Sequence, residues 1–331
     1  MSLKAYKKLN GYDVPSCYKL CAISRATGIL RNYRKAKRKG ERMKEPYARR
    51  LQLVTCYGLT IKDGFLHIPF KPKRSIQIPL NQHTQQILSN MTVRSVTLTA
   101  DHLSIAYAKE VAEVEPKGLI GIDRNLNNLT LADSSGHVER FNLGRATEIK
   151  SKYRTVKAHF SRNDVRIRRR IFRKYGEKQR NKVQDLLHNV SKQVVEEAKA
   201  KQFGLVMEDL KYMRRLYRKG NWQGRFYRGT MNSWSFAELQ RQIEYKARWE
   251  GLPVIYVKPH GTSSKCSICG YRLSEENRQM KCASCGLTVD RDVNAARNIL
   301  ARGVRFAPVA QPVEAMVVEP QTERNPQSRW L

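Results

Sequence analysis

Two cysteine pairs near the C-terminal end constrain the local fold more tightly than any other feature of this chain. Cys266 and Cys269 form one pair, Cys282 and Cys285 form the second, and twelve residues separate the two. A glycine follows each pair and lets the backbone turn and aim its amides at sulfur. Four thiolates suit a tetrahedral zinc ion with no open position, so we predict a structural zinc ribbon. An iron–sulfur cluster or two redox pairs are the alternatives.

The remaining cysteines and the apolar content bear on where the protein works. Cys17, Cys21 and Cys56 lack a second close pair, so we interpret them as packed or free thiols. The first thirty residues alternate polar and apolar side chains without a signal-peptide core. No segment reaches the roughly 20 apolar residues that span a bilayer. We therefore expect a cytoplasmic, nucleoid-associated protein without a membrane partner, whose paired cysteines bind metal rather than form disulfides.

Positive charge dominates the composition, with 63 Lys and Arg residues against 29 Asp and Glu and a formal net charge of +34. A compact chain this basic repels itself unless a polyanion neutralises it. Nucleic acid is the usual polyanion, because phosphate contacts release condensed counterions. Two basic blocks, 31–50 and 145–182, concentrate the charge. We predict nucleic-acid binding, with a solvated basic surface or a ribosome-like structural protein as the alternative.

The residue pattern changes several times along the chain and divides it into segments. Short β-branched runs broken by Gly, Pro, Asn and Asp follow the first basic block, and strand and helix patterns alternate after residue 117. The second basic block opens a helical insertion over 145–200. The predicted segments are a basic helical N-terminal region over 1–50, a β-rich nucleic-acid-binding module over 51–116, an α/β core over 117–257, the zinc ribbon over 258–289, a last helix over 290–303 and a disordered tail over 304–331.

Three acidic residues stand at the ends of apolar runs or at a helix start. Asp123 ends the run 119–122, Glu208 ends the run 205–207, and Asp292 opens a short helix. A carboxylate in such a place is costly unless it is solvated, hydrogen-bonded or bound to metal. Three converging carboxylates could hold two divalent ions about 3.5–4 Å apart and hydrolyse a phosphodiester. Magnesium prefers such oxygen ligands and keeps several waters.

Each of these acids also has an ordinary structural explanation. Asp123 could cap a turn, Glu208 could pair with an arginine, and Asp292 could be the N-cap of its helix. Asp209 and Asp290 are neighbours that compete for the same role. Because 85 and 84 residues separate the three acids, spacing by itself does not establish that they converge.

The segment 211–232 is rich in Arg, Gly and aromatic residues, and we predict a loop there. Trp222, Phe226 or Tyr227 could stack single-stranded bases. Packing of these rings into a core is the alternative interpretation.

Several motifs occur in an order and spacing that together cover about 117–300. They are Gly121-Ile122-Asp123 with the run 125–130, the run 206–210, the run from Trp234 to Pro259, the two cysteine pairs, and the run 290–299. This set resembles the TnpB family, transposon-encoded RNA-guided DNA endonucleases that are similar to the smallest type V CRISPR effectors.

The resemblance implies an α/β fold with an RNase H-like (RuvC) nuclease core over 117–257, an inserted four-cysteine zinc ribbon and a last core helix over 290–303. It implies that Asp123, Glu208 and Asp292 are catalytic and bind Mg²⁺, beside a structural Zn²⁺ at the four cysteines. It implies a guide RNA and a target DNA as partners. The basic blocks and the β-rich module would then bind the RNA scaffold and the guide–target duplex. They would contact the nucleic-acid backbone and recognise its shape, because base pairing carries the sequence information.

The chain departs from the family pattern at its start. The family usually opens with a strand of the β module and a helical recognition unit, whereas here the β module begins by about residue 51. We therefore expect a shortened N-terminal region. An RNA-guided, metal-dependent DNA endonuclease of a transposable element is the favoured function. A truncated, non-cleaving nucleic-acid-binding protein and a guide-independent RuvC-like nuclease are the alternatives.

Overall fold

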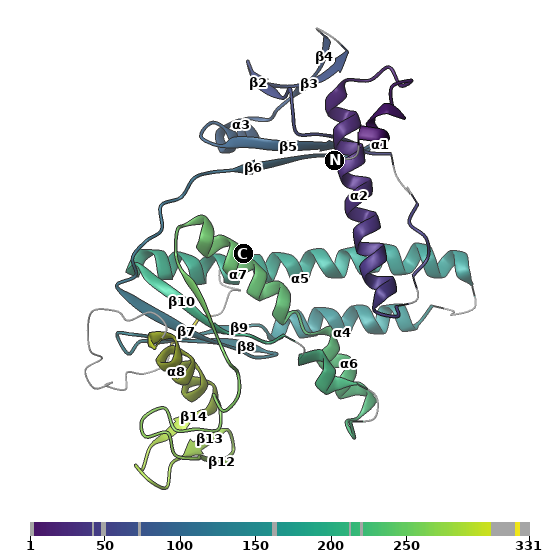
Figure 1. Ribbon diagram of the computed structural model, residues 1–331. Coiled ribbons are helices and arrows are strands. Elements are labelled where there is room, and N and C mark those ends of the chain that lie inside the picture. Colours follow the sequence, from purple (N-terminus) through teal and green to yellow (C-terminus); the bar gives the residue numbers. More distant parts are fainter. Residues whose placement is uncertain are drawn as a thin grey trace. The chain divides into compact units, whose positions relative to one another are not determined.

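The computed structural model describes residues 3–41, 43–47, 51–71, 74–160, 164–211, 213–218, 221–305 and 322–324. The chain divides into two compact units, Met1–Glu110 and Val111–Leu331. Figure 1 shows the helices and strands of both. Among the helices described, none combines the length and the apolar character needed to cross a membrane.

The first unit joins a basic helix to two small sheets. Its helices are α1 (Leu3–Lys7), α2 (Ser16–Arg38) and α3 (Gln82–Leu88). One sheet has the order β1 (Leu53–Thr55), β5 (Thr92–Leu98), β6 (Leu103–Ala108), and the other β2 (Thr60–Lys62), β3 (Phe65–Lys71), β4 (Arg74–Pro79). All contacts within both sheets are antiparallel. The short β-branched runs expected between 51 and 109 are therefore strands.

Two details of this region differ from the sequence-based expectation. The basic block 31–50 is helical only up to Arg38, because Gly40 adopts a left-handed φ of 73° that ends the helix. The division between the units falls at 110/111 rather than 116/117. The backbone N–H of Val114 donates to the carbonyl of Gly251, and its side chain packs on the core of the second unit.

A six-stranded mixed sheet organises the second unit (Figure 1). Its order is β11 (Val254–Val257), β10 (Phe203–Glu208), β7 (Gly118–Arg124), β8 (Asn128–Asp133), β9 (Val138–Asn142), β15 (Thr322–Arg324). Strands β7, β8 and β9 form an antiparallel meander, with a turn at Ser134–Gly136 between the last two. Strand β10 runs parallel to both β7 and β11. The carboxyl ends of these parallel strands therefore meet at one edge of the sheet.

Helices cover both faces of this sheet. On one face pack α4 (Gly144–Ala158), α5 (Val165–Lys201) and α7 (Phe236–Trp249), and α8 (Arg291–Val304) lies on the opposite face (Figure 1). Successive residues of a strand point to opposite faces, so each strand contributes side chains to a hydrophobic core on either face of the sheet. Ile120, Ile122, Leu205 and Met207 face α5 and α7, whereas Leu119 and Val206 face α8.

Three expected elements have different limits in the structure. The helical insertion expected over 145–200 is divided into α4 and α5, and α5 begins at Val165 behind the N-cap Asp164 and is largely exposed in its basic first half. The expected loop 211–232 contains the 3₁₀ helix η1 (Met213–Tyr217) and most of α6 (Arg225–Ser233). Of the expected disordered tail, Val304 ends α8 and 322–324 form β15, while 306–321 and 325–331 lie outside the described residues.

Gly121 permits the close approach of α8 to the sheet. A Cβ at this position would overlap the backbone oxygen of Ala296 and lie 2.6 Å from the backbone nitrogen of Leu300. Overpacking of this kind costs about 1–3 kcal/mol. We expect Gly121→Ala to lower the free energy of unfolding by that amount in urea titrations. Gly176→Ala is the matched control, because open space surrounds this glycine of α5 and the change favours helix; equal effects would contradict close packing at Gly121.

Candidate metal centres

The first candidate centre is built on the ends of the neighbouring strands β7 and β10. Ile122 lies in register with Met207, so Asp123 and Glu208 are the next residues of two parallel strands. Since Ile122 and Met207 face α5 and α7, alternation directs the following side chains to the α8 face. Asp123 and Glu208 are both buried. The sheet thus places two carboxylates, 85 residues apart in sequence, next to each other on the face that carries α8.

Asp292 adds a third carboxylate from the first turn of α8. Asp290 is the N-cap of this helix, because its carboxylate accepts hydrogen bonds from the backbone N–H groups of Asp292 (2.9 Å) and Val293 (3.2 Å). The alternative that Asp292 serves as N-cap is therefore wrong. Asp290 also pairs with Arg140 at 2.7 Å. These three contacts all fall on Oδ1 of Asp290, whereas the carboxylate of Asp292 is buried.

Neutral donors hold each of the three carboxylates. Asn125 Nδ2 donates to Asp123 Oδ2 at 2.7 Å and to Asn128 Oδ1 at 3.2 Å. Asn128 Nδ2 donates in turn to Asp292 Oδ2 at 3.0 Å. One chain of hydrogen bonds therefore connects Asp123 to Asp292 through two asparagines. Sequence reasoning gave these asparagines no role, although both lie in the run 125–130 that supports the family resemblance.

Glu208 has a separate partner, Thr262, which follows β11. Thr262 Oγ1 donates to Glu208 Oε1 at 2.6 Å, and both groups are buried. The buried guanidinium of Arg124 donates to the backbone carbonyl of Glu208 and to Gln240 Oε1. These hydrogen bonds of Arg124 go to a carbonyl and an amide, whereas the carboxylate of Glu208 accepts from a hydroxyl.

Crowding of negative charge is reflected in the titration of this centre. Burial, together with the charges of Glu208 and Asp292, raises the pKa of Asp123 from its ordinary 3.8 to about 7, although the hydrogen bond from Asn125 opposes this rise. Burial also raises the pKa of Glu208, against the lowering effect of Thr262. Buried carboxylates that repel one another favour either a shared proton or a bound cation.

The donor set of this centre fits a hard divalent cation. Its ligands are carboxylate oxygens, which magnesium prefers to nitrogen or sulfur. The oxygens of the three acids do not all lie within 4.8 Å of one another, in contrast to the cysteine sulfurs described below. The three acids therefore form a looser ligand set than the four cysteines in this structure.

A cation of the chain already contacts this centre. Arg278 Nη2 pairs with Asp292 Oδ2 at 2.5 Å, although the Arg278 side chain is itself 61% exposed. Arg278 and Asn277 form the turn between β12 (Ser274–Glu276) and β13 (Gln279–Lys281), and both adopt positive φ. A hairpin with this backbone is normally built from Asn and Gly. Sequence reasoning missed Arg278, and the Asn-Arg turn in a short polar hairpin was the available signal.

The second candidate centre is the cluster of four cysteines. All four sulfurs lie within 4.8 Å of one another, with 3.6 Å between Cys266 and Cys285 and 3.4 Å between Cys269 and Cys282. A disulfide requires about 2.05 Å, whereas a tetrahedral zinc site with bonds of about 2.3 Å separates its sulfurs by about 3.8 Å. The predicted cluster is confirmed, and its geometry fits zinc.

Each cysteine pair forms a tight turn, called a knuckle, that brings its two sulfurs together. The N–H of Gly270 donates to the carbonyl of Cys266, the N–H of Gly286 donates to the carbonyl of Cys282, and both bonds measure 3.0 Å. Both glycines adopt φ values above 70°, which a residue with a Cβ rarely tolerates. The hydrogen bond from the backbone of Tyr271 lowers the pKa of Cys269 to about 6. The equivalent backbone hydrogen bond from Leu287 also acts to lower the pKa of Cys285, but burial and the three neighbouring cysteines raise that pKa to about 12. Without metal, the four thiols therefore differ in how readily they lose a proton.

Asparagines of α8 connect the four-cysteine cluster to the acidic centre. Asn294 Oδ1 accepts from the N–H of Ser267 at 3.0 Å, and Asn294 Nδ2 donates to the carbonyl of Lys265 at 2.8 Å. Asn298 Nδ2 donates to the carbonyls of Thr262 and Lys265, both at 2.7 Å. The first two turns of α8 thus position both Asp292 and the start of the cysteine segment.

Among the described residues, His137, Glu139 and Glu197 form a further set whose potential ligand atoms lie within 4.8 Å of one another. Lys201 bonds to Glu197 Oε1 at 2.8 Å and to Asp133 at 2.7 Å. A lysine therefore already supplies positive charge to this set.

The other sequence candidates lie apart from these contacts. Asp209 pairs with Lys211 at 2.9 Å and follows the sheet edge rather than facing α8. Trp222, Phe226 and Tyr227 are exposed, so the alternative that they pack into a core is wrong. Cys21 is buried, and its sulfur lies 3.8 Å from that of Cys56, which is consistent with free thiols.

Comparison with known proteins places the chain in a family. Residues 236–299 match the family model described as the Cas12f1-like TNB domain. The TnpB-like protein MJ0751 of Methanocaldococcus jannaschii is 33% identical over 223 residues, which cover 64% of this chain and 79% of that protein. The TnpB-like protein MJ1635 of the same organism is 28% identical over 90% of this chain and 71% of that protein.

Similarity to Cas12f proteins is more distant. A CRISPR-associated endodeoxyribonuclease Cas12f1 of Sulfoacidibacillus thermotolerans is 36% identical over 117 residues, 34% of this chain and 25% of that protein. The cryo-EM structure of a Cas12f1–sgRNA–target DNA complex contains a chain of similar fold, with a TM-score of 0.50 and 16% identity over 75% of this chain and 59% of that chain. On the identity and coverage shared with its Methanocaldococcus relative, the chain belongs to the family of TnpB-like proteins.

Proposed function

We propose that this protein is an RNA-guided, metal-dependent DNA endonuclease with a RuvC-type core, in which Asp123, Glu208 and Asp292 bind Mg²⁺. The observation that carries the proposal is the set of buried carboxylates on the α8 face, with the pKa of Asp123 raised to about 7. A chain that only bound nucleic acid would gain nothing from burying mutually repelling acids. The mixed sheet, with its meander and parallel strands, supports the RNase H-like assignment.

In this proposal the residues of the chain fix the positions of the metal ligands. Bound Mg²⁺ would activate water and stabilise the charge of the leaving oxygen. Asn125 and Asn128 orient the carboxylates of Asp123 and Asp292, and Thr262 orients that of Glu208. Because Arg278 is long and exposed, it is free to leave Asp292 and contact a phosphate of the DNA instead.

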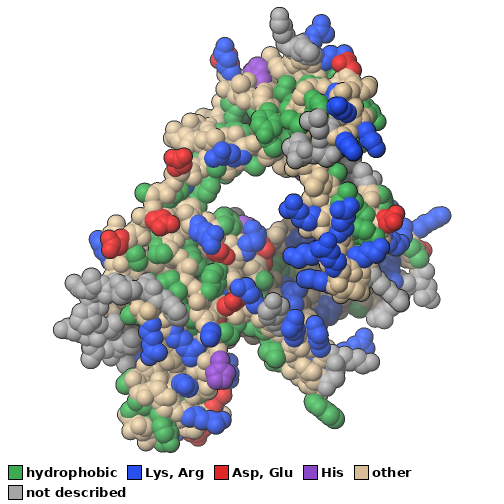
Figure 2. Space-filling view, viewed as in Figure 1, with side chains coloured by type: hydrophobic (Ala, Val, Ile, Leu, Met, Phe, Trp, Pro, Cys, Tyr) green, Lys and Arg blue, Asp and Glu red, His purple; other side chains and the backbone are tan. Residues whose placement is uncertain are grey.

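Guide RNA and target DNA are the proposed partners. Lys and Arg side chains predominate over Asp and Glu on the face shown in Figure 2. Helix α2 and the first half of α5 are exposed and basic, which suits contact with phosphates of a folded RNA or a duplex. The curated Cas12f1 relative is named an endodeoxyribonuclease, and the Cas12f1 chain of similar fold was solved with an sgRNA and target DNA.

The four-cysteine cluster is proposed to hold structural zinc. Four protein ligands leave no open coordination position, so the ion would stabilise the ribbon rather than take part in cutting. Through Asn294 and Asn298 the ribbon also supports the start of α8, and its hairpin presents Arg278 to Asp292. The segments 51–110, 117–257, 258–289 and 290–303 then correspond to the β-rich module, the nuclease core, the ribbon and the last core helix.

The test is to co-express the protein with the DNA that flanks its gene, purify it, and sequence the RNA that it retains. The complex is then incubated with Mg²⁺ and plasmids that carry a sequence complementary to that RNA. We expect a defined RNA and cutting that requires both the complementary sequence and the metal. A defined RNA without cutting would indicate a binding protein, and cutting of structured DNA without RNA would indicate a guide-independent nuclease.

A further inference from the structure

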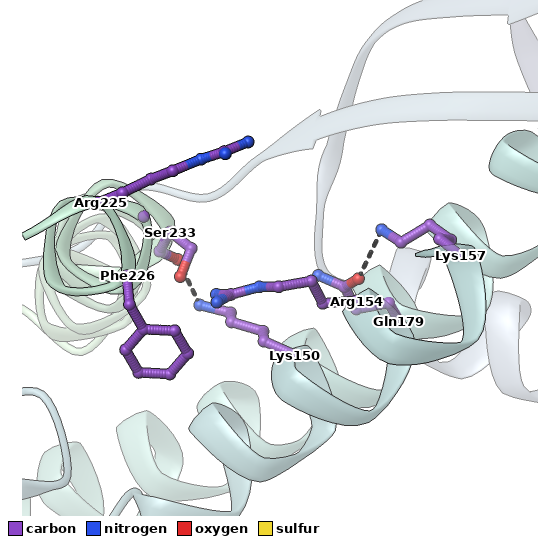
Figure 3. A pocket seen from close by; sticks show the side chains of 8 residues that line it. Lys150, Arg154, Lys157, Gln179, Arg225, Phe226 and Ser233 are labelled. Atoms are coloured by element: carbon purple, nitrogen blue, oxygen red, sulfur yellow. Dashed lines mark hydrogen bonds between the residues drawn. The ribbon is translucent and has the colours of Figure 1, made fainter. Parts of the chain in front are cut away.

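A cavity of about 610 Å³ lies between α4 and α6, beside α5 in the second unit (Figure 3). Lys150, Arg154 and Lys157 line it from α4, Arg225 and Phe226 from α6, and α5 contributes Gln179. Its volume lies within the range of about 300–1,000 Å³ that small-molecule sites occupy. In Figure 3 the side chains of Lys150 and Arg154 extend from α4 toward α6.

The charge of this cavity is positive and unbalanced. Four of its lining residues are Lys or Arg, and none is Asp or Glu. Within the described part of the chain, the ion pairs found involve none of these four cations. Mutual repulsion makes such a group costly unless an anion enters the cavity. A bound anion would therefore neutralise the repulsion between the four cations of this cavity.

Lys150 is held in place for such an anion. Its ammonium donates to the carbonyl of Ser233 and to Ser235 Oγ, both at 2.6 Å. An ammonium has three donor protons, so one remains for a ligand. Burial and the charge of Arg214 lower the pKa of Lys150 to about 8. Lys157 is likewise oriented, by a 3.0 Å hydrogen bond to Gln179 Oε1.

Phe226 distinguishes the cavity from a simple anion site. The residue is 73% exposed, and the guanidinium carbon of Arg154 lies 5.5 Å from the centroid of its ring. A free phosphate or an acidic peptide would gain little from this ring. A nucleotide matches both features, because its phosphate pairs with the cations and its base stacks on the aromatic face.

Only an unpaired nucleotide offers a free base face. In a duplex, the neighbouring base pairs cover both faces of each base, so duplex binding uses the phosphates alone. We propose that the cavity between α4 and α6 binds one nucleotide of a single strand, with its base on Phe226 and its phosphate at Lys150, Arg154 and Lys157. The site thereby deepens the proposed nucleic-acid function, on which its biological role rests.

A second basic groove on the same unit lacks these features. It runs along α5 and is lined by Arg169, Arg170, Arg173, Lys174 and Lys178, but it includes Glu177 and no aromatic side chain. Glu177 pairs with Arg173 at 3.2 Å. The α5 groove therefore suits phosphates of any strand, whereas the α4–α6 cavity selects an exposed base.

The experiment measures binding of fluorescent oligonucleotides by the full chain carrying Asp123→Asn, so that cutting does not interfere. Single-stranded DNA, single-stranded RNA and a DNA duplex of the same sequence are compared for this chain with and without Phe226→Ala. Since stacking contributes about 1–3 kcal/mol per base, we expect Phe226→Ala to weaken binding of a single strand by roughly 5- to 150-fold and to leave duplex affinity unchanged. The strand that loses affinity, DNA or RNA, identifies the natural occupant.

Phe172→Ala is the matched control, because this exposed phenylalanine also lies beneath an arginine, Arg168 at 5.7 Å, but lines neither the α4–α6 cavity nor the α5 groove. Unchanged affinity in Phe226→Ala, or an equal loss for duplex and single strand, would overturn the inference. Arg154→Gln is expected to weaken single-strand binding and to reduce its salt dependence. Because the assay needs neither a guide nor cutting, failure of guided cleavage would leave its result intact.

Discussion

Asp123→Asn is expected to lower magnesium-dependent DNA cutting roughly 10³-fold or more, because bound metal supplies several kcal/mol of transition-state stabilisation. The substitution keeps the shape of the side chain and removes its charge. Affinity for RNA and for DNA should stay within about twofold, since phosphate contacts to distant Lys and Arg supply it. Cutting rates and equilibrium binding measured on the same preparation test both statements.

A stability measurement shows whether the variant is folded. In the metal-free protein, the pKa of Asp123 is about 7 when folded and near 3.8 when unfolded. The folded state therefore binds more protons between these values, and stability falls as pH rises from about 4 to above 7. Asn carries no charge and removes this loss. We expect metal-free Asp123→Asn to be more stable than the original chain at pH 8, by on the order of 2–4 kcal/mol.

Asp209→Asn is the matched control for this prediction. Asp209 is adjacent to Glu208 in sequence, but its carboxylate is bonded to Lys211 instead of facing α8. It should retain cutting and show no gain in stability at pH 8. If Asp123→Asn lost both activity and stability at pH 8, Asp123 would be a structural residue and the proposed metal role would be wrong.

Cys282→Ser is expected to remove zinc from the protein and to unfold the ribbon. Structural zinc contributes about 10–16 kcal/mol to small zinc domains at pH 7. The ribbon's own sheet, formed by β12, β13 and β14 (Thr288–Asp290), is too short to replace that contribution. Cutting should fall as well, because Asn294 and Asn298 connect the ribbon to the helix that carries Asp292. Metal analysis is expected to find about one zinc per chain before the substitution and none in the ribbon after it.

Cys56→Ser provides the control, since Cys56 is exposed and lies in the first unit, outside the four-cysteine cluster. It should retain full zinc. Unchanged zinc in Cys282→Ser would refute the four-thiolate site. Iron with visible absorption in place of zinc would establish the iron–sulfur alternative that the cysteine spacing by itself allows.

Much of the local structure follows from sequence pattern alone. The spacing of the cysteines and their glycines predicted the cluster, because knuckle geometry is set over a few consecutive residues and needs a positive φ that glycine supplies. The apolar runs before Asp123 and Glu208 predicted buried strands with carboxylates at their ends. These features are local, so the residues that cause them stand next to one another in the chain.

Boundaries that depend on exposed or charged segments were less well predicted. The basic block predicted a helical insertion over 145–200 but did not show that it divides into α4 and α5, because charged residues dominate both helices. Helix α6 was missed within a segment rich in Arg and Gly, where exposed aromatic side chains replace a buried face. Glycine and clustered polar residues favour a loop prediction, so they outweighed the helix signal of this short segment.

The strands, the cysteine turns and the basic character that points to nucleic acid all follow from short stretches of sequence. Folding was needed to show that Asp123, Glu208 and Asp292 share one face, that Asp290 caps α8 in place of Asp292, and that Arg278 contacts the acids. The α4–α6 cavity likewise exists only after folding. Side-chain periodicity acts over a few residues, whereas strand register and helix docking depend on contacts between residues far apart in sequence.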